Sequence, residues 1–97
     1  MQLRVGIFGV GMWGKEHIRS IREEGRGDVA WVYSRTAETV KDVQREFGVP
    51  HGTQDYHDVL RDPTVQAVIV STPPYTHAAL ACDVLRAGKH LLLEKPL

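Results

Sequence analysis

The residues with the clearest chemical potential are three glycines near the start of the chain, in Gly9-Val10-Gly11-Met12-Trp13-Gly14. This G-x-G-x-x-G spacing follows an apolar run typical of a strand and opens a helical stretch. There the first glycine permits a tight turn, the second lets the backbone approach a pyrophosphate, and the third allows close helix packing. The helix N-terminus then offers amides to the phosphates. We predict a dinucleotide site that includes Met12 and Trp13. A plain tight turn, with Trp13 packed on a neighbour, is the alternative.

A second candidate group lies about 20 residues after the glycines, where an acid usually binds the ribose 2′-hydroxyl of NAD. The chain has Ser34-Arg35-Thr36 there, without a carboxylate. Ser34 and Thr36 can donate hydrogen bonds to a 2′-phosphate, and Arg35 can neutralise it or stack on adenine. This pattern favours NADP over NAD. In the alternative interpretation, Thr36 only caps the following helix and Arg35 is solvated.

The remaining candidates follow two further apolar runs. Ser71-Thr72-Pro73-Pro74 ends one run with hydroxyls and carbonyls that could meet the cofactor, and His77 follows it. Glu94 and Lys95 come directly after three leucines, where a lysine could guide a substrate oxygen or join a proton relay. Strand termination by proline, a surface position for His77 and a polar strand exit are the alternatives.

These groups need a scaffold of alternating strands and helices. Strands are predicted at 3–8, 29–34, 66–72 and 89–95, with a short one within 48–56. Helices are predicted at 12–25, 36–48 and 76–88, with a brief one at 55–60. The buried side of the 76–88 helix is predicted to carry Ala78, Ala81, Cys82 and Leu85. The alternation predicts an α/β fold, a doubly wound parallel sheet with strand order 3-2-1-4-5. Ligands of such sheets bind beyond the carboxyl ends of the strands, where every candidate group falls.

Composition narrows the function classes. The chain has 97 residues, 42% of them hydrophobic, with 12 basic and 12 acidic residues. This balance gives no electrostatic reason to expect nucleic acid or a membrane surface as partner. The single cysteine, Cys82, favours an intracellular, cytoplasmic location, and neither it nor the histidine spacing suggests a metal site.

Together these segments resemble the N-terminal domain of the glucose-fructose oxidoreductase, inositol dehydrogenase and MocA (Gfo/Idh/MocA) family. The likeness covers essentially the whole chain and is carried by GIFGVGMWGKEH and by VQAVIVSTPPYTHAALACDVLRAGKHLLLEKPL. It implies an NAD(P)-dependent oxidoreductase that acts on sugars, cyclitols or related carbonyl and alcohol substrates. It also implies that Glu94, Lys95 and Pro96 form the family's Glu-Lys-Pro motif, whose lysine lies near the nicotinamide and the substrate. The missing acid after the second strand departs from an NAD-type pattern.

The resemblance also implies a second α/β domain that supplies most substrate contacts. We therefore expect residues 1–97 to be an incomplete N-terminal NAD(P)-binding Rossmann domain, truncated before its end and lacking the C-terminal substrate domain. The isolated chain should then be inactive, whereas the full-length protein should be an enzyme and a homo-oligomer. Two alternatives stay open. One is a different dehydrogenase, such as a hydroxyacid dehydrogenase, and the other is a stand-alone nucleotide-sensing module.

Overall fold

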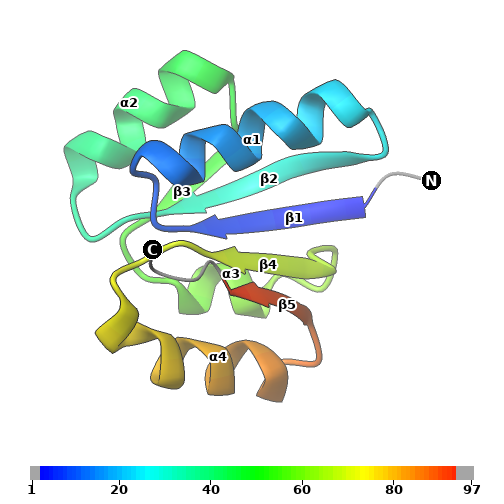
Figure 1. Ribbon diagram of the computed structural model, residues 1–97, viewed down its shortest axis with the longest axis vertical. Coiled ribbons are helices and arrows are strands. Elements are labelled where there is room, and N and C mark those ends of the chain that lie inside the picture. Colours follow the sequence, from blue (N-terminus) through cyan, green and yellow to red (C-terminus); the bar gives the residue numbers. More distant parts are fainter. Residues whose placement is uncertain (1–2, 94–97) are drawn as a thin grey trace.

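A five-stranded parallel sheet forms the centre of the computed structural model, which describes residues 3–93, with residues 12 and 13 in backbone only. The strands are β1 (Leu3–Phe8), β2 (Gly27–Tyr33), β3 (His51–Thr53), β4 (Ala67–Val70) and β5 (His90–Leu93). They lie in the order β3-β2-β1-β4-β5, and every neighbouring pair is parallel (Figure 1). The predicted strand order is confirmed.

Helices cover the sheet from both sides. They are α1 (Met12–Glu24), α2 (Ala37–Phe47), α3 (His57–Arg61) and α4 (His77–Arg86), with a 3₁₀ turn η1 (Pro74–Thr76) before α4. α1 and α2 lie on one face of the sheet, and α3 and α4 lie on the other (Figure 1). Among the described residues, no helix is long and apolar enough to cross a membrane.

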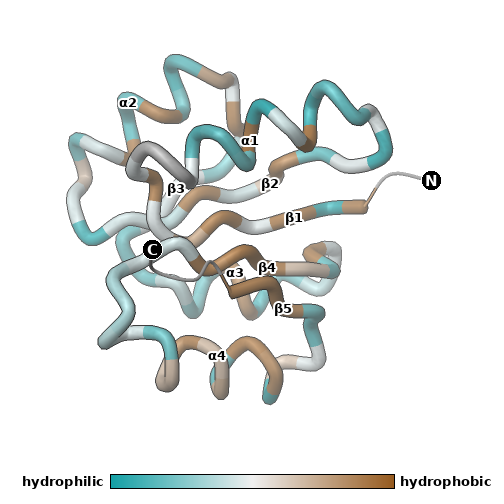
Figure 2. The backbone as a smooth tube through the Cα atoms, in the orientation of Figure 1, coloured by the Kyte–Doolittle hydropathy of each residue, from teal (hydrophilic) through white to brown (hydrophobic). Residues whose placement is uncertain are grey.

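Two hydrophobic cores result, because successive side chains of a strand point to opposite faces. Val5 and Ile7 of β1 pack in the core beneath α1 and α2, whereas Phe8 packs in the core facing α3 and α4. A strand covered on both faces reads as a continuous apolar run. β4 shows this pattern, and its hydrophobic residues stand out along the tube in Figure 2.

The prediction for the buried face of α4 was wrong. Leu80 and Val84 enter the core, whereas Ala78 and Cys82 are exposed and Leu85 is 60% exposed. Only Ala81 of the predicted set is half-buried. Most of the helix circumference is apolar, so the spacing alone did not select one face. The two bulky residues that fill the core lie four positions apart and therefore on one side of the helix.

Candidate nucleotide-binding site

A cleft of about 530 Å³ opens at the carboxyl edge of the sheet, where β1, β2 and β4 end. Its described lining consists of Gly9, Val10, Gly11, Tyr33, Ser34, Arg35, Thr36, Ser71, Thr72 and Pro73. The three strand ends are joined by backbone hydrogen bonds. Gly9 N donates to Tyr33 O at 3.0 Å, and Ser71 N donates to Phe8 O at 2.7 Å. Three groups that the sequence singled out therefore meet in one cleft.

The three glycines of the loop differ in what requires them. Gly9 has φ +88°, and a Cβ there would lie 2.9 Å from the backbone of Ser71 and Thr72. A Cβ on Gly14 would lie 2.3 Å from Gly9 O, so this glycine allows α1 to pack against the turn. Gly11 has an ordinary φ of −77°, and a Cβ there would meet no described atom within 4 Å. No contact within the described chain explains Gly11, but it lines the cleft, where a close ligand would need the space.

The start of α1 has no capping side chain. Gly11 is its N-cap residue, with no side-chain cap and no acidic residue in the first turn. The first amides of a helix have no partner within the helix and carry partial positive charge. Met12 and Trp13 contribute two of these amides, while their side chains lie outside the described part. The glycine loop and the helix start therefore fit a pyrophosphate.

The loop after β2 presents polar groups to the same cleft. Ser34 is half-buried, Arg35 and Thr36 are exposed, and Arg35 is the only charged residue among the described cleft residues. Thr36 occupies the N-cap position of α2, but its hydroxyl makes no capping hydrogen bond. Gln54 Nε2 donates to Arg35 O at 3.0 Å and ties this loop to the segment after β3. The loop backbone is thus held in place while the side chains of Arg35 and Thr36 face solvent.

The wall on the β4 side contains an unsatisfied group. Ser71 Oγ is buried and has no hydrogen-bond partner in the described structure. Buried polar groups are almost always hydrogen-bonded, so this hydroxyl calls for a partner that the described chain does not supply. His77, predicted to contact the cofactor, is not among the described cleft residues. Its Nε2 hydrogen-bonds Thr72 O at 2.8 Å, on the wall itself.

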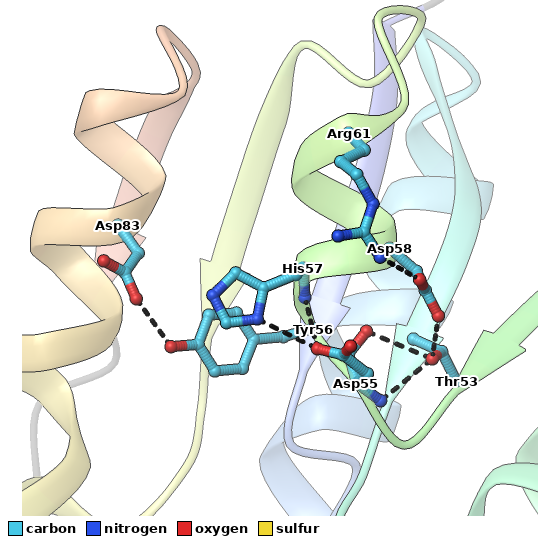
Figure 3. Close-up of polar contacts among 7 residues, drawn as sticks. All are labelled: Thr53, Asp55, Tyr56, His57, Asp58, Arg61 and Asp83. Carbon is cyan, nitrogen blue, oxygen red and sulfur yellow. Dashed lines mark hydrogen bonds and ion pairs between the residues drawn. The ribbon is translucent and has the colours of Figure 1, made fainter.

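Sequence reasoning missed an aromatic cluster that supports the cleft. Tyr33 lines the cleft, and its ring packs against Phe8 and Tyr56 with centroid distances of 5.5 and 5.6 Å. The Tyr56 hydroxyl donates to Asp83 of α4 at 2.5 Å, while His57 stacks on the Tyr56 ring (Figure 3). This hydrogen bond to the carboxylate raises the pKa of Tyr56 to about 12. The only feature of the sequence that could have predicted this cluster is that Phe8 and Tyr33 end two strands that were expected to be neighbours.

A second cleft lies at the opposite edge of the sheet, where the strands begin, and its buried charged group already has protein partners. This cleft of about 570 Å³ includes Lys89, which is buried and donates to Asp62 O at 2.8 Å and Val65 O at 2.7 Å. The Asp62 carboxylate accepts from Trp31 Nε1 at 2.8 Å and from Thr64, and these hydrogen bonds lower the pKa of Asp62 to about 2. Lys89 and Asp62 thus already have protein partners, so they serve the fold.

Two predicted site residues, Glu94 and Lys95, lie outside the described residues. β5 is described through Leu93, the residue directly before them, and it runs parallel to β4. The carboxyl end of β5 therefore points to the same edge of the sheet as the cleft.

The fold and the position of the cleft place the protein in the Rossmann class. A family model described as an oxidoreductase family with an NAD-binding Rossmann fold matches residues 3–97, and the chain belongs to this family. The resemblance predicted from the motifs is thereby confirmed. The chain is 32% identical to inositol 2-dehydrogenase of Salmonella typhimurium, with 100% of this chain and 30% of the relative covered.

Solved structures agree with this placement. GenD2 from gentamicin A biosynthesis, in complex with NAD, is 35% identical with a TM-score of 0.93, covering 99% of this chain and 27% of that one. Biliverdin reductase from Synechocystis sp., in complex with biliverdin and NADP+, is 29% identical with a TM-score of 0.89, covering 98% and 30%. The chain spans only 26% to 30% of the length of the curated relatives compared with it.

Proposed function

We propose that this chain is the cofactor-binding part of an NAD(P)-dependent oxidoreductase that acts on a sugar, a polyol or cyclitol, or a related carbonyl compound. The observation that carries the proposal is Gly11, which lines the cleft although no described contact and no unusual φ requires a glycine there. The inositol 2-dehydrogenase relatives support the substrate class. When bound, the nicotinamide cofactor would supply or accept the hydride.

Different residues of the cleft would bind different parts of the cofactor. The loop from Gly9 to Gly14 and the first amides of α1 would hold the pyrophosphate. The hydroxyls of Ser34 and Thr36 and the cation of Arg35 would hold a 2′-phosphate, so NADP is the preferred cofactor. The absence of any carboxylate among the described cleft residues supports this preference, because a carboxylate would repel the phosphate.

The substrate side of the reaction needs residues beyond the cleft. We place Lys95 beside the nicotinamide and the substrate, as the family motif implies, with Glu94 next to the cofactor. Most substrate contacts are assigned to a C-terminal domain, for which the greater length of the relatives leaves room. On this proposal residues 1–97 bind the cofactor only weakly and without turnover, and the full-length protein is a cytoplasmic, homo-oligomeric enzyme.

Calorimetric titration of the chain with NADP+ and NAD+ tests the proposal. NADP+ should bind more tightly, and Arg35→Ala should remove roughly 1.5–3 kcal/mol of NADP+ binding, about a 10- to 150-fold rise in Kd. Arg45→Ala is the matched control, because Arg45 lies in the last turn of α2 and its side chain is 79% exposed. Equal affinities for the two cofactors that Arg35→Ala leaves unchanged would reject the NADP preference.

A further inference from the structure

The wall formed by Ser71, Thr72 and Pro73 sets the width of the cleft. Its first residue is anchored to β1, because Ser71 N donates to Phe8 O at 2.7 Å. The backbone of the wall also lies close to the glycine loop, since a Cβ on Gly9 would be 2.9 Å from Ser71 C and from Thr72 N. A shift of the wall would therefore change its distance from the loop that faces it.

Two side chains that are not among the described cleft residues hold this wall. His77 Nε2 lies 2.8 Å from Thr72 O, and Thr76 Oγ1 donates to Pro73 O at 2.6 Å. A carbonyl oxygen only accepts, so the Nε2 atom of His77 must carry a hydrogen. Both contacts come from the junction of η1 and α4, so the start of α4 fixes the far end of the wall.

The same contacts set the polarity of the Thr72 hydroxyl. Thr72 Oγ1 and Thr76 Oγ1 are 2.5 Å apart and share a hydrogen bond. The single hydroxyl hydrogen of Thr76 is already donated to Pro73 O, so Thr72 must be the donor of the shared bond. The hydrogen of Thr72 therefore points at Thr76, and only lone pairs of Thr72 Oγ1 remain for the cleft. These lone pairs suit a hydroxyl donor, such as a ribose hydroxyl, and disfavour a phosphate oxygen.

We infer that Thr76 and His77 are positioning residues of the dinucleotide cleft, which fix the place of its wall and the hydrogen-bond polarity of Thr72 without contacting the ligand. The inference rests on the proposed function, because it concerns the same cleft. It assigns His77 an indirect role, through the Thr72 carbonyl. A purely structural role at the start of α4 would change the stability of the chain and leave its affinity for dinucleotide as it was.

Paired variants separate the two roles. The dissociation constant for NADP+ and the melting temperature are measured for His77→Ala, His77→Gln, Thr76→Val and Thr76→Ser. Each pair contains one variant that loses the hydrogen-bonding group and one that keeps a similar group. His90→Ala is the control, because His90 is exposed and begins β5 at the opposite edge of the sheet. In addition, long-range ¹⁵N NMR of the His77 ring should show a hydrogen on Nε2.

His77→Ala and Thr76→Val should each raise the Kd about tenfold, because the first removes one hydrogen bond that holds the wall and the second removes two. His77→Gln, Thr76→Ser and His90→Ala should bind within a factor of about two of the unmodified chain. If His77→Ala does not fold, the two Thr76 variants decide. The inference is overturned if Thr76→Val binds NADP+ as tightly as the unmodified chain, or if Thr76→Val and Thr76→Ser lose the same affinity. Either result leaves the proposed function standing. An unmodified chain that binds neither NADP+ nor NAD+ overturns the proposed function as well.

Discussion

Replacing Ser71 by alanine should make the chain more stable and a weaker binder of dinucleotide. Ser71 Oγ is buried without a hydrogen-bond partner in the described structure, and an unsatisfied buried polar group costs ~1–3 kcal/mol. Ser71 as a whole is only half-buried, so the gain should lie at the low end. Ser71→Ala should therefore raise the free energy of unfolding by about 1 kcal/mol.

The effect on binding should have the opposite sign, because Ser71 lines the cleft, and a rotation about its Cα–Cβ bond on binding would give the buried hydroxyl a partner on the cofactor. A hydrogen bond contributes about 0.5–1.5 kcal/mol net, so the Kd for NADP+ should rise roughly two- to tenfold. Urea unfolding followed by tryptophan fluorescence gives the first quantity, and calorimetric titration gives the second. A gain of stability with a loss of affinity identifies a polar group kept for a ligand.

Ser20→Ala serves as the control, since Ser20 is exposed in the middle of α1. It should add at most about 0.5 kcal/mol of stability through helix propensity and leave the Kd unchanged. If Ser71→Ala instead destabilises the chain and binds NADP+ normally, the hydroxyl serves the fold and the reasoning is refuted.

Three further predictions concern groups outside the cleft wall. The depressed pKa of Asp62, about 2, means that its carboxylate stabilises the fold above pH 4 and that this contribution is lost as the pH falls towards 2. Asp62→Asn should thus be less stable than the unmodified chain at pH 7, and urea unfolding should show the difference shrinking at pH 2; a constant difference would contradict this. The raised pKa of Tyr56, about 12, implies stability that is present below pH 10 and lost as the pH rises through 12. Tyr56→Phe should cost about 1 kcal/mol at neutral pH, with coupling to Asp83→Ala in a double-mutant cycle, and additive losses would show that the two do not interact. In the proposed full-length enzyme, Lys95→Ala should lower turnover with little change in melting temperature, whereas a large stability loss with normal turnover would make Lys95 structural.

The sheet order and the meeting of the candidate groups could be predicted because both follow from local patterns. Apolar runs that alternate with helical stretches fix the parallel sheet, and its carboxyl edge then brings Gly9, Ser34 and Ser71 together. The face of α4 could not be predicted in the same way. Its residues are apolar around most of the helix, and only tertiary packing shows that Leu80 and Val84 enter the core.

Contacts between distant segments also escaped prediction. The hydrogen bond from Tyr56 to Asp83 joins residues 27 positions apart and depends on how α3 and α4 pack on one face of the sheet. The alternative interpretation of Thr36 as a capping residue is right about its N-cap position, but its hydroxyl makes no capping hydrogen bond. The sequence predicted that His77 lies near the cleft. Its hydrogen bond with Thr72 O could not be predicted, because it depends on how η1 and α4 are placed.

Amide NMR of the ¹⁵N-labelled chain during titration with NADP+ tests most directly whether the carboxyl-edge cleft binds dinucleotide. The amide signals of Gly9, Gly11 and Ser71 should move in proportion to saturation, because they line the cleft or flank the helix start. The signals of Gly88 and Lys89, at the opposite edge, should stay in place. Two results would contradict a dinucleotide site at the glycine loop. One is a set of shifts confined to the opposite edge. The other is no shift at millimolar NADP+ and NAD+, because a Kd of 1 mM already corresponds to a binding free energy of only about −4 kcal/mol.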